Sequence, residues 1–344
     1  MAESTATSAQ REARPQAQVL EVDNALEIDA AATDNDSTYG QELSTYTASL
    51  TSSVLDYRKE NGRTYHGYRD GSYLLPNDKT ELDRLDMVHE MTLTIMNRKL
   101  FYAPIGPSPQ RVYDVATGTG IWAIQFGEDF PSAEVIGSDL SPSQPNMVPP
   151  NVKFIVDDIE DEWLYENDPF DFIHARYLVF SIKDFPKLIK QAYKCTKPGG
   201  WVEFQDWDPT CHSEDGTTKD TAIEDYYRLI IEGYESQGYE TCPGPKLEQW
   251  LRDAGFVDIK AEKHRVPMGT WPKDKKFKTL GAWNLMQAEI GFEASAMALL
   301  TRFHGWSADE VKILAAQTLK DARDRNIHPV FHFWVVYGRK PESA

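Results

Sequence analysis

Cysteine is scarce in this sequence. Cys195, Cys211 and Cys242 are spread over 344 residues and form no C-x-x-C pair. An odd number at such spacing argues against a disulfide framework and favours a reducing compartment. The N-terminus lacks the apolar stretch of a secretory signal, and no apolar run reaches the roughly 18 residues of a membrane span. We therefore expect no membrane segment and a location in the cytoplasm, the nucleus or both.

Positive charge is also scarce, because 36 lysines and arginines stand against 54 aspartates and glutamates, for a net charge of −18. Nucleic acids and anionic membranes bind clustered positive charge, so we expect neither as a direct partner. Residues 1–50 hold nine acids, two arginines and few large apolar side chains. Such a segment buries too little apolar surface to offset the entropy of ordering it. We predict a disordered acidic tail at 1–50 and one folded unit at 51–344.

Metal-ligating patterns are missing as well. His328 and His332 fall on one face of a predicted strand, without cysteine or acid partners at the spacing of zinc ligands. Cys211 and His212 are adjacent but form no metal or nucleophile motif by themselves. We therefore predict no metal site and interpret these residues as structural.

What the sequence does contain is a regular alternation of strand and helix patterns. Strands are predicted at 111–116, 133–140, 151–159, 170–180 (running into a helix start) and 201–207, with helices at 121–130 and 185–196. This alternation indicates an α/β fold of the Rossmann-like kind, with a mostly parallel, seven-stranded sheet and helices on both faces. A helical cap at 51–108 precedes it, and further helical patterns follow Asp208, with strands at 256–268 and 330–340.

A glycine-rich turn joins the first strand of this alternation to its helix. Gly118, Gly120 and Ala123 fit the spacing of a dinucleotide fingerprint, and Asp139 ends the next strand, where a ribose-binding acid is expected. Glycine lets the backbone approach a ligand, and the helix N-terminus attracts a negative group. This signal fits an NAD enzyme and an S-adenosylmethionine enzyme equally well.

Three further features favour S-adenosylmethionine. Asp114 lies on the strand before the turn, where a carboxylate helps to neutralise a cationic ligand and NAD gains little from it. Asp157 and Asp158 follow the third strand, where an acid and the apolar Ile159 suit an adenine. The segment 197–200, Lys-Pro-Gly-Gly, forms a turn directly before the fifth strand.

In this order the motifs resemble those of class I S-adenosylmethionine-dependent methyltransferases. More narrowly, the stretches NGRTYHGYRDGSYLLPNDKTELDRLDMVHE, TGTGIWAIQF, GSDLSPSQPNMVPPNVKFIVDDIEDEW and FDFIHAR look like the fungal LaeA-like methyltransferases, over roughly residues 50–340. The resemblance implies the fold predicted above and S-adenosyl-L-methionine as cofactor.

Residue by residue, the resemblance places Asp114 at the methionine amino end of the cofactor. The backbone of Ala116, Gly118 and Gly120 would pass close by. The family usually has glycine where this sequence has Ala116, a small change that should still permit binding.

The remaining cofactor contacts follow in the same way. Asp139 would accept hydrogen bonds from the ribose hydroxyls, and Asp157 or Asp158 from the adenine amine. Tyr65 is a candidate to wall the sulfonium, since aromatic rings attract cations. A packed N-terminal segment is the structural alternative for Tyr65, and a solvated turn is the alternative for the two acids.

Catalytic residues are the least defined part of the prediction. His174 and Arg176 end the fourth strand near the expected methyl group, and Asp206 follows the fifth strand. His174 is a candidate general base, because histidine titrates near neutrality. Arg176 is a candidate to hold an acidic group. Each has a structural alternative, and methyl transfer needs a base only if the acceptor must lose a proton.

The resemblance leaves two functions open. The chain could methylate a small secondary metabolite, or it could regulate secondary metabolism with a velvet-type protein partner, with or without catalysis. A third interpretation, an NAD-dependent oxidoreductase, lacks support from Asp114 and from a Tyr-x-x-x-Lys pair after the fourth strand.

Overall fold

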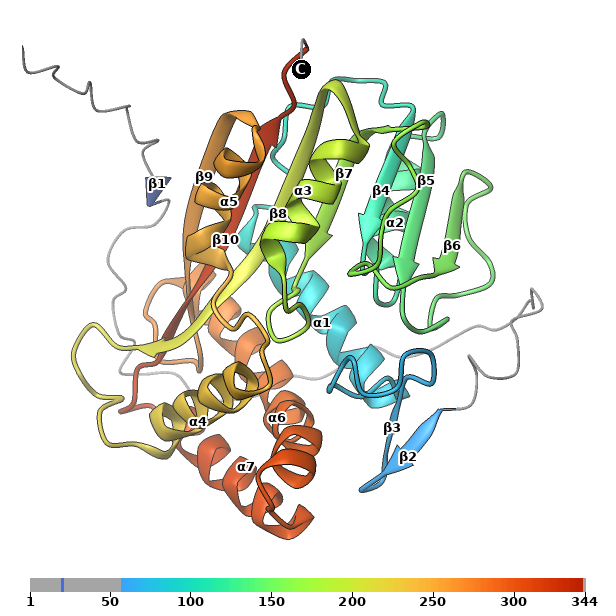
Figure 1. Ribbon diagram of the computed structural model, residues 1–344. Helices are drawn as coiled ribbons and strands as arrows, with labels where there is room; N and C mark the ends of the chain where they lie inside the picture. The colour runs from blue at the N-terminus through green and yellow to red at the C-terminus, as the bar shows by residue number, and fades with distance from the viewer. Residues whose placement is uncertain (1–19, 22–56, 343–344) are drawn as a thin grey trace, which may run out of the picture.

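The computed structural model describes residues 20–21 and 57–342 of the chain, shown in Figure 1. Its strands are β1 (Leu20–Glu21), β2 (Arg58–Glu60), β3 (Arg63–Tyr65), β4 (Arg111–Val115), β5 (Glu134–Asp139), β6 (Val152–Val156), β7 (Phe170–Arg176), β8 (Thr196–His212), β9 (Val257–Pro267) and β10 (Val330–Arg339). Its helices are α1 (Lys79–Ile95), α2 (Ile121–Asp129), α3 (Phe185–Cys195), α4 (Ala222–Ser236), α5 (Leu247–Ala254), α6 (Lys275–Phe303) and α7 (Ala308–Arg323), with a 3-10 turn at Gly244–Lys246.

The large sheet has the order β1-β9-β10-β8-β7-β4-β5-β6. Within this order, the neighbouring strands from β8 through β7, β4 and β5 to β6 are all parallel to one another. Strand β10 is antiparallel to both of its neighbours, β8 and β9. The chain leaves β4 toward β5 and β6 on one side and returns to β7 and β8 on the other. The carboxyl end of β4 is therefore a topological switch point, where open α/β sheets bind ligands.

A second layer of helices covers this edge of the sheet. Figure 1 shows α1, α4, α6 and α7 gathered beyond the ends at which the parallel strands finish. Asp78 caps α1 by accepting from Glu81 N, and Ser307 and Glu310 form the predicted capping box of α7. Helix α1 packs along α6, so segments far apart in sequence enclose one apolar cluster.

The structure confirms the fold class and the seven-stranded, mostly parallel core, to which β1 adds a short parallel edge strand on β9. The predicted tail at 1–50 otherwise lies outside the described residues. In the described part of 51–108, the predicted helical cap consists of the β2–β3 hairpin and α1. Over the described residues, no helix is long and apolar enough to cross a membrane.

Two local predictions are wrong. No helix starts at the end of 170–180, because Tyr177 (φ 62°) and Phe180 (φ 65°) adopt left-handed backbone conformations that interrupt it. The segment 197–200 belongs to β8 instead of forming a turn before it. Backbone hydrogen bonds with Lys340, at Gly199 and at Gly200, keep this irregular start paired with the chain after β10.

Candidate functional site

The glycine-rich turn after β4 is tied to the end of β5. Thr117 N donates to Ser138 O over 2.8 Å, and Gly118 N donates to Asp139 Oδ2 over 2.9 Å. A Cβ at Gly120, where φ is 79°, would lie 2.5 Å from the Phe154 ring, so this position requires glycine. The turn therefore holds a fixed shape at the start of α2, as the sequence pattern predicted.

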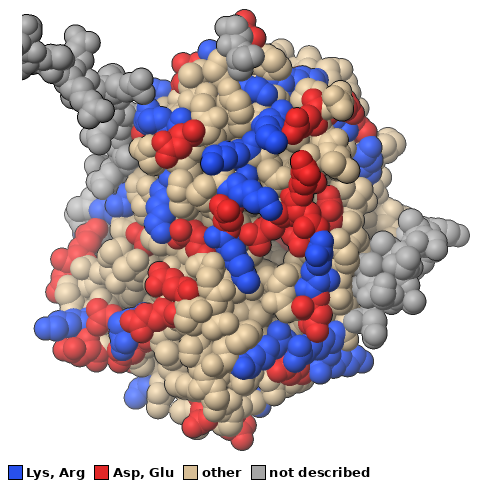
Figure 2. All heavy atoms as spheres, in the orientation of Figure 1, with Lys and Arg blue, Asp and Glu red and all other residues tan. Residues whose placement is uncertain are grey.

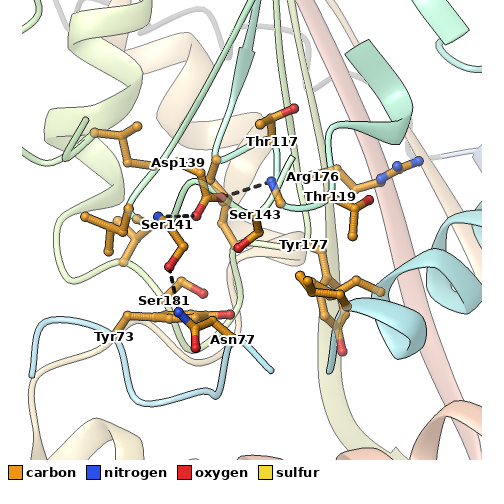
Figure 3. Close-up of a pocket in the computed structure, with 18 of the residues that line it drawn as sticks. Tyr73, Asn77, Thr117, Thr119, Asp139, Ser141, Ser143, Arg176, Tyr177 and Ser181 are labelled. Atoms are coloured by element: carbon orange, nitrogen blue, oxygen red, sulfur yellow. Dashed lines mark hydrogen bonds between the residues drawn. The ribbon is translucent and has the colours of Figure 1, made fainter. Parts of the chain in front are cut away.

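A cavity of about 1190 Å³, partly open to solvent, lies beside this turn. Its lining combines the carboxyl ends of β4, β5, β6 and β7 with the N-terminal segment around α1. Figure 3 shows Tyr73 and Asn77 across the cavity from Asp139 and Ser141, and Asn77 Nδ2 donates to Ser141 Oγ over 3.1 Å. The N-terminal segment thus closes a site that the sheet opens.

Asp139 is the acid at the centre of this cavity. Its carboxylate accepts from Gly118 N and, over 3.1 Å, from Ser141 N. Burial raises the pKa of the Asp139 carboxyl to about 6. The group is thus mostly ionised at neutral pH, and its position at the end of β5 is the one predicted for a ribose contact.

Asp157 and Asp158 line the same cavity beyond β6, next to Ile159. Asp157 Oδ1 accepts from Asp158 N, and Asp158 Oδ1 accepts from Glu160 N. Burial raises the pKa of the Asp157 carboxyl. The predicted acid and apolar side chain therefore do lie together at the cavity wall.

Asp114 lies behind the turn, not in the cavity lining. Its Oδ2 accepts from Thr117 Oγ1 over 2.5 Å, and its Oδ1 lies 2.8 Å from Nδ1 of His174. His174 is 1% exposed, stacks on Trp122 and likewise does not line the cavity. Burial lowers the pKa of His174, and the Asp114 carboxylate is placed to accept a hydrogen bond from its Nδ1. Asp114 and His174 therefore stabilise the glycine-rich turn through hydrogen bonds on the side away from the cavity.

Arg176 does reach the cavity. Its Nη2 donates over 2.7 Å to Nδ1 of His89 on α1, whose Nε2 then donates to Gln125 Oε1 over 3.1 Å. Burial and the charge of Arg176 lower the pKa of His89 to about 3, whereas burial lowers the pKa of Arg176 to about 10. Arg176 remains charged at neutral pH, and its buried Nη1 has no hydrogen-bond partner among the described residues.

Tyr65 and Gly120 are the other predicted contacts that lie outside the cavity lining, whereas Ala116 and Gly118 are part of it. The Tyr65 ring is 1% exposed and lies under the Arg302 guanidinium, 4.6 Å from its Cζ. Tyr73, eight residues later, lines the cavity instead. The sequence reading noted aromatics in this segment but chose a different tyrosine.

Asp206, a predicted catalytic candidate, holds the chain after β7. Its buried carboxylate accepts from Leu178 N, Val179 N and Trp207 N, at 2.9, 3.2 and 2.9 Å. Burial raises the pKa of Asp206 to about 7. Asp206 does not line the cavity, but Tyr177 and Leu178, in the turn that it fixes, do.

The sequence reading missed His89 and Tyr177, although one signal for His89 was available. Leu82, Leu85 and His89 recur at i, i+3 and i+7 and share one face of α1. All three line the cavity, so this face of α1 is directed toward the site. No sequence pattern indicates that Tyr177 lines the cavity, because its position depends on its left-handed backbone conformation.

Of the histidines that the sequence analysis interpreted as structural, His212 and His332 lie close together in the structure and His328 does not. Ligand atoms of Asp208, His212 and His332 lie within 4.8 Å of one another at the far end of β8 and β10. The register of these strands shifts between Val330 and His332, and Nε2 of His212 lies 3.6 Å from Oδ2 of Asp208. His328 is separate and lies against Asp215.

Comparison with known proteins decides between the cofactors. Residues 87–261 match the family described as "Methyltransferase domain". "Methyltransferase pytC" of Aspergillus terreus is 41% identical over 318 residues, covering 92% of this chain and 95% of that protein. "Secondary metabolism regulator laeA" of Monascus pilosus is 33% identical, covering 93% and 89%. "Probable methyltransferase tdiE" of Emericella nidulans is 33% identical, covering 86% and 92%.

The chain belongs to the LaeA-like methyltransferase family. It is a methyltransferase of the S-adenosylmethionine-dependent class, as its sheet order and glycine-rich turn also indicate. The interpretation as an NAD-dependent oxidoreductase is set aside. This LaeA-like chain has relatives of two kinds, enzymes and regulators, and the family match alone does not choose between them.

Proposed function

We propose that this LaeA-like protein binds S-adenosylmethionine in the cavity beside β4 and methylates a small molecule of fungal secondary metabolism. The observation that carries the proposal is the buried, unpartnered Nη1 of Arg176 in the same cavity as Asp139. An unpaired buried donor costs about 1–3 kcal/mol, and a ligand carboxylate would remove that cost.

The lining fits the cofactor group by group. Arg176 would hold the methionine carboxylate, Asp139 the ribose hydroxyls, and Asp157 or Asp158 the adenine amine, with Ile159 beside the adenine ring. Arg and carboxylate groups make the strongest hydrogen bonds in proteins, so these contacts are well suited to recognition. When bound, the cofactor would supply an electrophilic methyl carbon on a sulfonium, so that an acceptor lone pair could form a bond to that carbon in line as the carbon–sulfur bond breaks and the thioether S-adenosylhomocysteine leaves.

The residues of the chain contribute alignment more than proton transfer. Asp114, Thr117 and His174 fix the glycine-rich turn from behind, and Tyr73 with Asn77 closes the cavity over it. Holding two reactants in line and excluding water is the main requirement of such a displacement. His89 does not serve as a base, because both its nitrogens are hydrogen-bonded within the protein.

The unit that performs this chemistry is, by our proposal, residues 51–344, with 51–108 as its cap and 1–50 as an appendage. A second candidate function is regulation through a velvet-type partner in the nucleus, with the cofactor fold retained. The relatives called "Secondary metabolism regulator" favour it, whereas the higher identity to "Methyltransferase pytC" favours a small-molecule acceptor.

The test combines binding and product analysis. Calorimetry should show binding of S-adenosylmethionine and not of NAD to the wild-type protein, and much weaker binding to Asp139→Ala. The enzyme is then incubated with tritiated-methyl cofactor and a fungal mycelial extract. Label in the organic-solvent fraction supports a small-molecule acceptor. Label confined to protein, or no transfer at all despite binding, contradicts it and favours the regulatory candidate.

A further inference from the structure

A second cavity, of about 740 Å³ and partly open to solvent, adjoins the cofactor cavity. It lies within the helical layer, between α1, α4 and α6 and the ends of β8 and β10. Tyr177 lines both cavities and is the wall between them.

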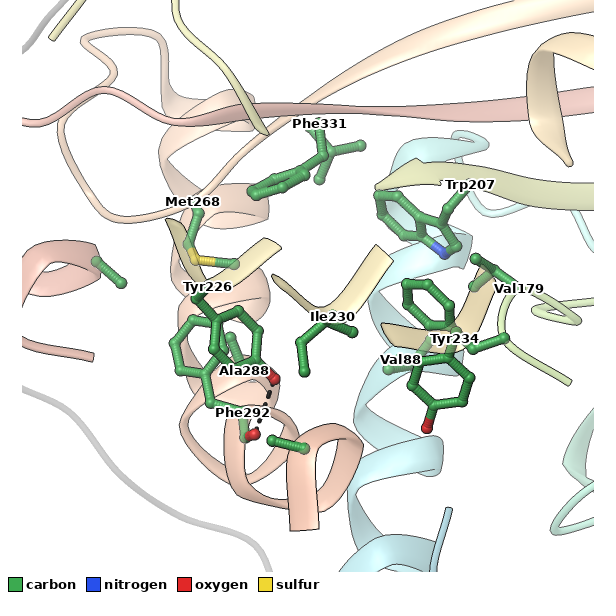
Figure 4. Packing of buried hydrophobic residues seen from close by; sticks show 14 of the residues in the cluster. Val88, Val179, Trp207, Tyr226, Ile230, Tyr234, Met268, Ala288, Phe292 and Phe331 are labelled. Carbon is green, nitrogen blue, oxygen red and sulfur yellow. Dashed lines mark hydrogen bonds between the residues drawn. The ribbon is translucent and has the colours of Figure 1, made fainter. Parts of the chain in front are cut away.

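The lining of the second cavity is mostly apolar and aromatic. Its members include Met91, Val179, Phe180, Tyr226, Ile230 and Phe292. Figure 4 shows Val179, Tyr226, Ile230 and Phe292 in the same cluster of side chains as Trp207 and Phe331. Rings on several sides of one space favour a flat, apolar ligand that stacks or packs edge-on.

The second cavity offers no unpaired charge. Arg84 is the charged side chain among the described residues that line it. Its guanidinium is bound to Glu81 through Nε, over 2.9 Å, and through Nη2. Its Nη1 donates to Gln287 Oε1 over 2.9 Å and to the Tyr177 hydroxyl over 3.2 Å. A charged ligand would enter this space without a counter-ion, so an uncharged ligand is favoured.

One polar atom of the lining lacks a partner. Trp207 is 7% exposed, and its indole Nε1 is buried with no hydrogen-bond partner among the described residues. Buried tryptophans usually satisfy this N–H, and leaving it unpaired costs about 1–3 kcal/mol. The Trp207 ring lies edge-on to Tyr177, with 6.4 Å between ring centroids, so this free donor is next to the wall of the cofactor cavity.

We propose that the second cavity binds the methyl acceptor, and that this acceptor is an uncharged, largely flat molecule with an oxygen that accepts a hydrogen bond from Trp207. This inference rests on the proposed function and specifies its substrate class. The acceptor would lie with its oxygen at the Tyr177 wall, and so with its reactive end toward the cofactor.

The experiment uses three probes of one shape: 2-naphthol, naphthalene, which lacks the oxygen, and 2-naphthoate, which is charged. Binding is measured by calorimetry at neutral pH with S-adenosylhomocysteine present. We expect 2-naphthol to bind most tightly and 2-naphthoate least. Trp207→Phe keeps an aromatic ring, although a smaller one, and removes the N–H, so it should weaken 2-naphthol about fivefold to tenfold more than it weakens naphthalene.

Trp334→Phe is the matched control, because Trp334 also has a buried, unpartnered Nε1 but does not line the cavity. It should leave all three affinities unchanged. Crystals soaked with 6-bromo-2-naphthol should show an anomalous bromine peak beside Trp207. Equal losses in the two variants, tighter binding of 2-naphthoate, no binding of any probe, or a peak elsewhere would each overturn the inference. Titration of S-adenosylmethionine into the same samples tests the proposed function separately, since the cofactor can bind while every naphthyl probe fails.

Discussion

The imidazole of His174 lies flat on the indole of Trp122, with 3.8 Å between the ring centroids and 2° between the ring planes. Trp122 is the second residue of α2, and His174 is on β7, so the stack joins the helix after the glycine-rich turn to a neighbouring strand. The buried carboxylate of Asp114 hydrogen-bonds to Nδ1 of that imidazole and to the hydroxyl of Thr117 in the turn. The shape of the glycine-rich turn thus depends on Asp114, Trp122 and His174, which do not line the cavity.

The first prediction concerns Asp114. Asp114→Ala removes the hydrogen bonds to Thr117 and His174 and should weaken S-adenosylmethionine binding about tenfold to hundredfold, as expected for bonds to a charged group worth about 1.5–3 kcal/mol. Thr117→Val removes the turn bond alone and should have a smaller effect. Calorimetry on both variants checks this, and an Asp114→Ala protein with wild-type affinity would remove Asp114 from any role in the site.

The second prediction is a pH dependence set by Asp139. Burial raises the pKa of Asp139 to about 6 from an ordinary value of 3.8, so its contribution to stability is fully present below pH 3.8 and is lost as the pH rises through 6. Cofactor affinity should move in the opposite direction, because ribose hydroxyls donate to the ionised carboxylate. We expect affinity to fall as the pH drops below about 6, and Asp139→Asn to be weaker but flat with pH. An equally steep profile in the variant would assign the titration to another group.

The third prediction separates the two ends of the cofactor. Arg176→Met should weaken S-adenosylmethionine strongly but leave 5′-methylthioadenosine, which has no methionine carboxylate, nearly unchanged. Asp139→Ala should weaken both ligands, because both carry the ribose. Parallel titrations give the four affinities. A similar loss for both ligands in Arg176→Met would show that Arg176 does not act on the carboxylate.

The fourth prediction concerns stability, on α6. A Cβ at Gly281 would lie 1.9 Å from the carbonyl oxygen of Gly269, whose own N–H donates to Gly281 O. Gly281→Ala should therefore lower the free energy of unfolding by about 2 kcal/mol or more. Gly291→Ala, on the same helix, has Gln287 Oε1 as its nearest atom at 3.4 Å and should be neutral or stabilising. Urea denaturation of both proteins checks the contrast.

The sequence predicted the parts of the site that depend on local pattern. The turn at Gly118 and Gly120, and the strand-end position of Asp139, follow from spacing along the chain, and the structure places them as expected. The contact of Arg176 with His89 could not be read in this way, because β7 and α1 meet only through tertiary packing. Tyr65 and Tyr73 illustrate the same limit, since the composition of their segment does not say which ring turns inward.

On the face shown in Figure 2, Lys and Arg side chains are interspersed with Asp and Glu. Elsewhere among the described residues, lysines and acids also pair directly, as Lys153 does with Glu134 and Lys246 with Glu240. Interspersed charges of this kind do not make the continuous basic stripe that a phosphate backbone requires.

The left-handed backbone at Tyr177 ties the two cavities to a single dihedral angle. Any replacement that relaxed the backbone of Tyr177 would therefore change the shape of both cavities together. The residues of α4 and α6 that line the second cavity do not line the first. If the second cavity binds the acceptor, as we propose, substitutions in α4 and α6 would change which metabolite fits while the cofactor cavity kept its lining, so one scaffold could yield many products.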